Sequence, residues 1–355
     1  MTLLVTGVAG FIGSNFVYHY LDGHPERTIT GIDNLSYAGN LDNLSALTDE
    51  QKERFLFVKA DITNPDQVRK IFDDYPVDGV INMAAETHVD RSIYDPQVFL
   101  KTNILGTHVL LEAAKHSWQK HGAWKKGSKF LQVSTDEVYG TLGESGFFSE
   151  TTPIDPHSPY SASKASADLI VKAYHDTYGM PVTITRCSNN YGAYQFPEKL
   201  IPLVITNALH HSSIPVYGDG KQVRDWLYVE DHCRAIDLVF EKGRAGETYN
   251  IGGNTEKENI IIIKEVLCLL EKMTGDTTIT QELISFVKDR PGHDRRYAID
   301  ASKIRKELGW YPRVPFQEGI DKTVRWYIDH QDWMSRVMSG EYRDFYEKNY
   351  NNRNF

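Results

Sequence analysis

The 355 residues of the chain exceed the usual length of a single domain, so a large lobe joined to a smaller one is expected. A hydrophobic share of 41% and a charged share of 25% are typical of a globular enzyme, and a net charge of −9 argues against nucleic acid as a general partner. No apolar run reaches the length of a membrane span, so no membrane partner is expected.

The three cysteines (Cys187, Cys233 and Cys268) are scattered and lack the spacing of metal ligands. An odd number of isolated cysteines is typical of reduced thiols, which persist in reducing compartments. The first residues lead directly into an apolar strand, without a charged leader or an apolar signal region. We therefore expect a cytoplasmic protein with no metal site.

A glycine-rich loop follows the first expected strand. Residues 3–6 are apolar, and Gly7, Gly10 and Gly13 then form a GxxGxxG pattern before an expected helix. Such glycines allow a tight turn and close approach of the backbone, while the helix N-terminus offers free N–H groups to a pyrophosphate. A glycine loop by itself also fits an ordinary tight turn. The order of strand, loop, helix and second strand favours a dinucleotide site.

The second expected strand, residues 29–32, ends at Asp33, twenty residues after Gly13. A carboxylate at this place accepts hydrogen bonds from both ribose hydroxyls and repels a 2′-phosphate. The sequence therefore predicts NAD rather than NADP.

Two further expected strands end close to the same site. Residues 55–58 lead to Asp61, which is predicted either to cap the following helix or to hydrogen-bond an adenine amine. Residues 79–82 lead to a segment with small alanines, which permit close approach of a flat ligand. His88 alone is predicted to be structural, and the apolar spacing of the helix around residues 102–114 is typical of packing against the sheet.

A pair of acids follows the apolar strand predicted at residues 130–133. Asp136 and Glu137 are unusual at this place, because carboxylates are depleted in strands and costly to bury without partners. Neighbouring residues of a regular strand point to opposite faces, so both acids can serve one substrate only if the strand has already ended. Like charges at close range raise one of the two pKa values, which keeps one acid protonated.

Tyr160 and Lys164 lie four residues apart on an expected helix and therefore share one face. A nearby ammonium group favours the phenolate and is expected to lower the pKa of Tyr160. We expect Tyr160 to act as a base, with the hydroxyl of Thr135 directed at the same substrate oxygen.

The alternation of strands and helices up to residues 182–186 predicts an α/β fold with a Rossmann-type, doubly wound parallel sheet. We expect residues 1–190 to form the NAD-binding lobe and residues 191–355 mainly a smaller α/β substrate-binding lobe. Residues 226–252 are expected to return to the first lobe. The tail after Tyr350 is expected to fray.

The segment from Asp289 to Tyr297 is a dense basic loop. Basic loops are usually solvated surface. In an acidic chain, Arg290 together with Arg224 and Lys199 also suits a diphosphate held by charge-assisted hydrogen bonds, which the surrounding aromatic residues favour.

The motifs resemble those of the extended short-chain dehydrogenases/reductases and, within them, the dTDP-glucose 4,6-dehydratase family. The glycine loop and the pair of Tyr160 and Lys164 are shared by the wider family. Sharper matches are STDEVYG at 134–140, SNNYGAYQFPEKLIPL at 188–203, RDWLYVEDH at 224–232 and DRPGHDRRYAID at 289–300. The chain departs from family patterns in a short loop between Gly140 and Glu150 and in Ala193, where many relatives have proline.

The resemblance implies an NAD site, a dTDP-glucose site and a catalytic group in specific positions. The catalytic group is Thr135, Asp136, Glu137, Tyr160 and Lys164. The implied NAD contacts are Gly7, Gly10, Phe11, Ile12, Gly13, Asp33, Asn34, Leu35, Ser36, Asp61, Ile62, Met83, Ala84, Ala85, Glu86, Thr87, Thr102, Tyr160, Lys164 and Asn190. The implied substrate contacts are Thr87, Thr135, Asn189, Lys199, Leu200, Pro215, Val216, Tyr217, Arg224, Asn259, Asp289, Arg290, Pro291, Gly292 and His293.

The implied reaction is the loss of water from a hexose after oxidation at C4, which gives a 4-keto-6-deoxy sugar nucleotide. Alternatives within the wider family are a 4-epimerase, a UDP-glucuronate decarboxylase and a dehydratase that uses a different nucleotide. The acid pair disfavours the epimerase, whereas no residue visibly distinguishes thymine from uracil. An NAD-binding regulator without activity is disfavoured because Tyr160, Lys164 and Thr135 are all present.

The resemblance also implies a homodimer, formed by the helices around residues 97–115 and 160–178. From the sequence, helices that form such a four-helix bundle are indistinguishable from helices that only cover the sheet.

Overall fold

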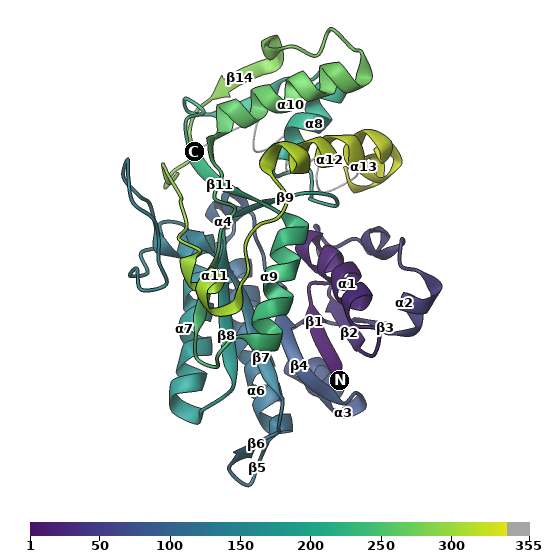
Figure 1. Cartoon of the computed structure of the whole chain (residues 1–355), viewed down its shortest axis with the longest axis vertical. Coiled ribbons are helices and arrows are strands. Elements are labelled where there is room, and N and C mark those ends of the chain that lie inside the picture. Colours follow the sequence, from purple (N-terminus) through teal and green to yellow (C-terminus); the bar gives the residue numbers. More distant parts are fainter. Residues whose placement is uncertain (339–355) are drawn as a thin grey trace.

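The computed structural model describes residues 1–338 and is built on a seven-stranded sheet in which every pair of neighbours is parallel (Figure 1). The strand order is β12-β8-β7-β4-β1-β2-β3. The strands are β1 (Thr2–Thr6), β2 (Thr28–Asp33), β3 (Phe55–Lys59), β4 (Val77–Asn82), β7 (Lys129–Thr135), β8 (Val182–Cys187) and β12 (Thr248–Ile251). The predicted doubly wound parallel sheet is confirmed.

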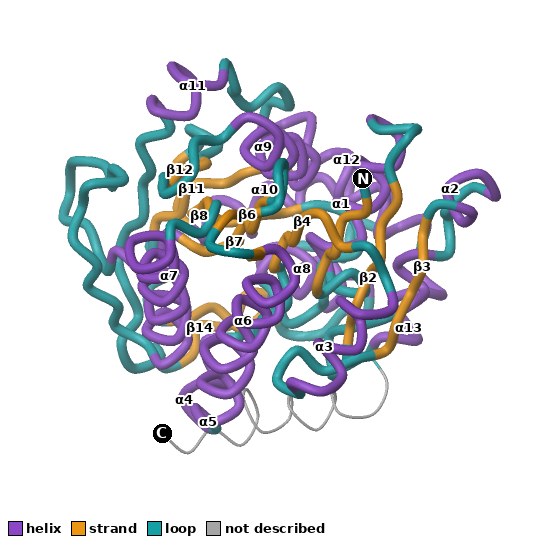
Figure 2. The backbone as a smooth tube through the Cα atoms, turned by 90° about the horizontal axis from the view of Figure 1, so that it is seen from below, coloured by secondary structure: helices purple, strands orange, loops and turns teal. Residues whose placement is uncertain are grey.

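Helices cover both faces of this sheet (Figure 2). One face carries α1 (Phe11–Gly23), α9 (Val229–Lys242) and α11 (Ser302–Leu308), and the other carries α3 (Pro65–Asp74), α6 (Thr107–Trp118) and α7 (Pro159–Tyr178). The ends of α7 show why this segment is helical. The Ser158 hydroxyl accepts a hydrogen bond from the Ser161 N–H, Pro159 occupies the first turn, and Gly179 ends the helix with a left-handed φ of 67°.

The strand order reverses between β1 and β4, which places a topological switch point at the loops that follow these strands. Polar side chains at the ends of neighbouring strands form hydrogen bonds with one another at this switch point. The Thr6 hydroxyl donates to Asn82 Oδ1 over 2.7 Å, and the Asn82 amide donates to Gln132 Oε1 over 2.8 Å. These bonds fix the edge of the sheet at which ligands of such folds bind.

A smaller lobe lies beyond this edge and has its own core (Figure 1). Buried aromatic residues such as Tyr191, Trp226 and Tyr327 pack there against aliphatic helix faces. The lobe contains β9 (Asn189–Tyr191), β10 (Ile214–Tyr217), β11 (Val223–Tyr228), β13 (Glu256–Glu258), β14 (Ile284–Val287), α8 (Leu200–Leu209), α10 (Asn259–Thr274), α12 (Phe316–Asp329) and α13 (Gln331–Val337).

The remaining elements are short. They are η1 (Leu41–Leu44), α2 (Asp49–Glu53), α4 (Val89–Tyr94), α5 (Pro96–Phe99), η2 (Leu100–Gly106), β5 (Gln119–Lys120), β6 (Ala123–Trp124), η3 (Asp136–Tyr139) and η4 (Gln281–Leu283). The helix expected around residues 102–114 instead begins as the π-helical turn η2, and regular α-helix starts only at Thr107. π-Helical turns often occur at functional sites, because the wider turn redirects side chains.

In residues 1–338, no helix combines the length and the apolar character that crossing a bilayer requires. The tail after Tyr350, for which fraying is predicted, lies outside the described residues.

Candidate active site

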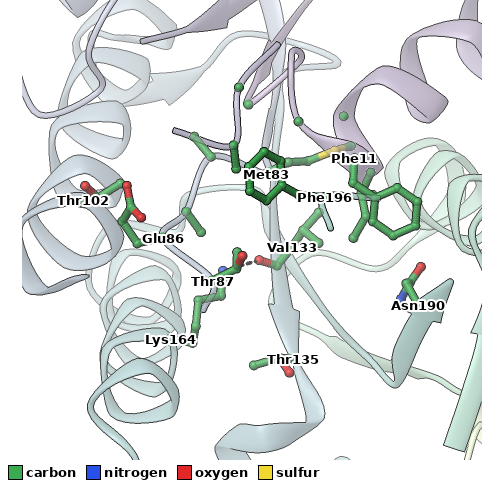
Figure 3. Close-up of a pocket in the computed structure, with 18 of the residues that line it drawn as sticks. Phe11, Met83, Glu86, Thr87, Thr102, Val133, Thr135, Lys164, Asn190 and Phe196 are labelled. Atoms are coloured by element: carbon green, nitrogen blue, oxygen red, sulfur yellow. Dashed lines mark hydrogen bonds between the residues drawn. The ribbon is translucent and has the colours of Figure 1, made fainter. Parts of the chain in front are cut away.

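A deep cavity opens at the switch point and reaches from the glycine loop to the acid pair. All five predicted catalytic residues line it, and so do the predicted NAD contacts except Leu35 and Asp61. Figure 3 shows part of this lining, with Thr135 and Lys164 among the labelled residues. We call this cavity the cofactor cavity. Its full lining is Gly7, Gly10, Phe11, Ile12, Gly13, Ile32, Asp33, Asn34, Ser36, Ala38, Gly39, Ala60, Ile62, Met83, Ala84, Ala85, Glu86, Thr87, Thr102, Val133, Ser134, Thr135, Asp136, Glu137, Tyr160, Lys164, Cys187, Ser188, Asn189, Asn190, Gln195, Phe196, Glu198 and Lys199.

The glycine loop leaves no room for side chains, as a dinucleotide cradle requires. Gly7 has a φ of 73°, and a Cβ added to it would lie 2.9 Å from the Ala84 nitrogen. A Cβ on Gly13 would lie 2.0 Å from the Gly7 carbonyl oxygen. Helix α1 begins at Phe11, directly after Gly10, and no side chain caps the N–H groups of its first turn. These groups are therefore free to bind a pyrophosphate, so the loop fits NAD.

Asp33 ends β2 beside the loop and is held by two backbone groups. The Ala9 N–H donates to its Oδ2 over 3.0 Å, and the Leu35 N–H donates to its Oδ1 over 2.8 Å. Burial raises the pKa of the Asp33 carboxyl, while these two hydrogen bonds oppose that rise. The carboxylate has a fixed orientation in the cavity wall and can accept further hydrogen bonds from ribose hydroxyls.

The acid pair lies on η3, the single helical turn that follows β7 at once. The Thr135 hydroxyl caps this turn by accepting a hydrogen bond from the Glu137 N–H over 3.3 Å. The strand ends at Thr135. Asp136 and Glu137 therefore do not have to point to opposite faces of the sheet, as neighbouring residues of a strand do. Both line the cofactor cavity, which confirms that the strand ends before the pair.

The surroundings differ for the two acids. Burial, followed by the Glu137 carboxylate, raises the pKa of Asp136 well above its usual value, and Asp136 Oδ2 is buried without a hydrogen-bond partner in the described chain. Burial also raises the pKa of Glu137, but Arg290, Arg224 and Lys199 oppose this rise. Asp136 is therefore suited to hold a proton and Glu137 to accept one, which agrees with the expectation that the two acids differ in protonation state.

This arrangement predicts how stability depends on pH. A carboxyl whose pKa is higher in the folded than in the unfolded state stabilises the fold below its unfolded pKa and loses that contribution as pH rises. Asn at position 136 cannot ionise. We expect Asp136→Asn to raise the melting temperature relative to wild type by more at pH 8 than at pH 5, as thermal denaturation at both values would show. An equal shift at both values would contradict the raised pKa.

Tyr160 and Lys164 project from the first turns of α7 into the cavity, one helical turn apart. The predicted lowering of the pKa of Tyr160 is wrong for this structure. Burial raises that pKa well above its usual value, Glu137 raises it further, and the Thr135 hydroxyl lowers it. The Lys164 ammonium donates to the Val133 carbonyl oxygen over 2.7 Å, so this contact fixes its position (Figure 3).

A second cavity lies between the cofactor cavity and the smaller lobe, and we call it the sugar-nucleotide cavity. It is lined by eleven of the fifteen predicted substrate contacts, namely Thr87, Asn189, Lys199, Leu200, Pro215, Val216, Tyr217, Arg224, Asn259, Arg290 and His293. Its other lining residues are His88, Val89, Asp90, Glu137, Glu198, Leu203, Gly220, Gln222, Trp226 and Ile263.

Three basic side chains meet in this cavity, as predicted for a diphosphate site. The Arg224 guanidinium donates to the Asp294 carbonyl oxygen over 2.9 Å and lies 4.1 Å from the Tyr297 ring centroid. Arg290 lies 3.1 Å from the Asp90 carboxylate, and Lys199 donates to the Thr87 carbonyl oxygen over 2.9 Å. These contacts hold the cations in place, and each retains donors for a further anion.

Six predicted contacts lie outside the cavity lining expected for them, and one of these, the predicted substrate contact Thr135, lines the cofactor cavity instead. Asp61 neither lines the cofactor cavity nor caps α3; it accepts from the Thr63 N–H over 2.8 Å, while Asn64 supplies the cap. Leu35 contacts the Asp33 side chain through its N–H instead. Asp289, Pro291 and Gly292 lie outside the lining of the sugar-nucleotide cavity.

The sequence does not predict several polar lining residues, among them Glu198, His88 and Asp90. Glu198 stands next to the predicted contact Lys199, which is the only local signal for it. His88 caps α4, where its Nδ1 accepts from the Arg91 N–H over 3.3 Å, so its predicted structural role is confirmed.

Outside the cavities, His24, Asp237 and Glu241 bring one possible metal-ligand atom each within 4.8 Å of one another. His19 and His24 both contact the Asp237 carboxylate, and Arg27 lies 3.6 Å from Glu241. These contacts join the end of α1 and the loop after it to α9.

The family model of GDP-mannose 4,6 dehydratase matches residues 4–323, which include both cavities. The chain belongs to this family. Among its curated relatives is the dTDP-glucose 4,6-dehydratase of Xanthomonas campestris, which is 53% identical over 96% of this chain and 97% of the relative.

Solved structures of this dehydratase family and its neighbours superpose closely on the chain. A dTDP-glucose 4,6-dehydratase from Streptomyces venezuelae, crystallised with NAD, has a TM-score of 0.86 and 45% identity, covering 95% of this chain and 100% of the other. A UDP-glucose 4-epimerase from Thermotoga maritima has a TM-score of 0.81 and 30% identity, covering 93% and 100%. The fold is therefore shared by dehydratases and epimerases, and the site must distinguish them.

Proposed function

We propose that the chain is an NAD-dependent dTDP-glucose 4,6-dehydratase, a hydro-lyase that forms dTDP-4-keto-6-deoxy-glucose and water. The observation that carries the proposal is the buried pair of Asp136 and Glu137 on η3, in the same cavity as Tyr160 and Lys164. Epimerisation at C4 needs the tyrosine but has no use for two acids in different protonation states. The dTDP-glucose 4,6-dehydratases that the chain resembles at about 50% identity support this choice of nucleotide.

NAD held in this cavity would accept the hydride from C4 and later return it to C6. Tyr160 takes the proton of the C4 hydroxyl, and the adjacent Thr135 hydroxyl holds the C4 oxygen. The Lys164 ammonium, one helical turn from Tyr160, favours the phenolate, whereas burial and Glu137 oppose it. The residues of the glycine loop and Asp33 hold the dinucleotide.

The new C4 ketone acidifies the hydrogen at C5. Glu137, which three cations favour in its ionised form, removes this proton. Asp136, which burial keeps protonated, gives its proton to the C6 hydroxyl, which leaves as water. Each acid thus acts in the protonation state that its own surroundings favour.

The decisive experiment incubates the purified protein separately with dTDP-glucose and with UDP-glucose and analyses the products by mass spectrometry and by NMR of the hexose, which distinguishes C4 epimers and locates deuterium. Loss of one water from dTDP-glucose, with deuterium from heavy water at C5, is the expected result. A product of unchanged mass epimerised at C4 would establish the 4-epimerase instead, and turnover of UDP-glucose alone would overturn the choice of nucleotide. An absence of any turnover would favour the non-catalytic NAD-binding regulator.

The positions of the two cavities support the proposal that each lobe binds a different ligand. We assign NAD binding to residues 1–190 with the returning segment 226–252, and sugar-nucleotide binding mainly to the remainder after residue 190. The position of β12 in the large sheet and the separate core around Tyr191 and Trp226 support this assignment. The three unpaired cysteines suit the reducing environment of the cytoplasm.

We also propose a homodimer, because large apolar side chains are exposed along the helices for which the bundle is predicted. Leu105 on η2 and Leu169 on α7 are each 57% exposed, and Val98, Leu100 and Tyr178 are exposed on the same pair of segments. Such clustering is uncommon on a monomer surface and is typical of an interface.

Leu105→Asp combined with Leu169→Asp is expected to convert the dimer to a monomer, because two new charges would be buried in the apolar contact. Light scattering coupled to size-exclusion chromatography measures the mass. As a control, the exposed Phe286, on β14, is changed to Asp, which should leave the mass unchanged. A wild-type protein that elutes as a monomer would contradict the proposed dimer.

A further inference from the structure

A histidine and two acids lie close together outside both cavities, where α1 packs beside α9 (Figure 1). His24 directly follows α1, while Asp237 and Glu241 lie one helical turn apart on α9. We call these three residues the histidine–acid cluster. An imidazole nitrogen and two carboxylate oxygens form a donor set that suits zinc. The expectation of no metal site rests on the cysteines, and none of them belongs to this cluster.

The separations within the cluster match those between neighbouring ligands of a zinc ion. His24 Nε2 lies 3.0 Å from both carboxylate oxygens of Asp237, and one possible ligand atom of each residue lies within 4.8 Å of the others. Two donors that each lie about 2.0–2.2 Å from zinc are about 3.3 Å apart in a tetrahedral site. A zinc ion can therefore enter with small movements of these side chains, and it would replace the direct contact between His24 and Asp237.

Each carboxylate of the cluster has one oxygen that a neighbouring side chain contacts. His19 Nε2 lies 3.2 Å from Asp237 Oδ2, and an Arg27 nitrogen lies 3.6 Å from Glu241 Oε2. Glu241 Oε1 is buried and has no hydrogen-bond partner within residues 1–338. Lys129 donates to the backbone carbonyl oxygen of Glu241 and not to its carboxylate. Outer contacts of this kind orient the ligands of metal sites, and here they leave Oε1 available.

A buried hydroxyl beside the cluster also lacks a partner. Tyr20 is 0% exposed, its ring centroid lies 4.4 Å from that of His24, and its hydroxyl forms no hydrogen bond within the described part of the chain. Burial raises the pKa of this hydroxyl, Arg27 lowers it, and Glu241 and Asp237 raise it, so the hydroxyl faces these charges. A water molecule in the open position of a three-ligand zinc site would give the hydroxyl a partner.

We propose that His24 Nε2, Asp237 Oδ1 and Glu241 Oε1 bind one zinc ion, with water as the fourth ligand. The ion would link the end of α1 to α9 and so stabilise the large lobe. None of the three ligands lines either cavity, so zinc should leave turnover unchanged. The proposal goes beyond the proposed function and does not depend on it.

Isothermal titration calorimetry of the NAD-loaded protein, freed of metal with EDTA and dialysed, tests the site with zinc alone. Wild type should bind one zinc ion per chain, and zinc should raise its melting temperature. His24→Ala and Glu241→Gln should each weaken zinc binding by about 100-fold or more, because each removes a ligand. His19→Ala removes only the contact with Asp237 Oδ2, and a loss of about 10-fold is expected.

The matched control is His211→Ala. His211 Nε2 lies 3.4 Å from the Asp276 carboxylate, and neither residue belongs to the cluster. This variant should bind zinc as wild type does. Cobalt(II) in place of zinc provides a second measurement, since its visible spectrum reports the ligands. The spectrum should lack the charge-transfer band of a thiolate, which binding at the exposed Cys268 would produce.

Glu241→Gln keeps the size of the side chain, so its zinc affinity decides the proposal even if His24→Ala is unstable. A wild-type protein that binds no zinc contradicts the site, and so does an equal affinity of wild type and Glu241→Gln. A thiolate band, or a loss of binding in His211→Ala, would place the ion elsewhere and overturn the assignment. None of these measurements uses dTDP-glucose, so failure of the proposed function would leave them unaffected.

Discussion

Tyr160→Phe is expected to slow the formation of the 4-keto-6-deoxy product by about 10²–10⁴-fold, the usual loss when a positioned acid-base group is removed. The phenol lies in the cofactor cavity with the Thr135 hydroxyl, and no other tyrosine of residues 1–338 lines that cavity. Because the C4 ketone is needed before the C5 proton can leave, the variant should be blocked at the first chemical step. No ketone should accumulate.

The measurement is mass spectrometry of quenched reactions, which separates unchanged dTDP-glucose from both ketone products. Tyr20→Phe is the matched control, because the Tyr20 hydroxyl is buried without a hydrogen-bond partner and lies outside both cavities. It should turn over at the wild-type rate. Wild-type activity in Tyr160→Phe would show that another group takes the C4 proton.

Asp136→Asn is expected to act at the second step and to separate oxidation from dehydration. The amide cannot deliver a proton to the departing C6 hydroxyl, so loss of water should slow by about 10²–10⁴-fold. Tyr160, Thr135 and Lys164 remain in place, and oxidation at C4 should continue. The 4-ketoglucose nucleotide should therefore accumulate in this variant.

Reactions in heavy water distinguish the two acids. In Asp136→Asn, Glu137 can still exchange the acidified C5 hydrogen, so deuterium should enter C5 of the accumulated ketone. In Glu137→Gln this exchange should be lost. Release of the 6-deoxy product at the full rate by Asp136→Asn would refute its assignment as the acid.

The local sequence signals predict the sheet and most of the cofactor cavity because both are built from contiguous patterns. The glycine loop, Asp33 and the acids after β7 stand at strand ends, and a parallel sheet brings strand ends to one edge. The π-helical turn at Leu100–Gly106 has no such signal, since its apolar spacing also fits a regular helix.

Long-range contacts explain the other differences. The sequence suggests that Lys164 lowers the pKa of Tyr160, but burial and the distant Glu137 dominate in the fold. Asn64 caps α3 in place of Asp61, because it directly precedes the helix and its side chain accepts hydrogen bonds from the first N–H groups of α3. The position of Glu198 could not be predicted, because its hydrogen bond with Tyr37 joins residues that are far apart in the chain.

The short turn η3 has a consequence for how such enzymes diversify. Four residues after a central strand carry both acids, and Gly140 ends the turn with a φ of 83°. The elements that grip the dinucleotide lie on other strands. Under the proposed function, replacement of this one turn should change the reaction at C5 and C6 and leave oxidation at C4 in place. The turn is therefore a short segment to replace when the reaction of such an enzyme is to be altered.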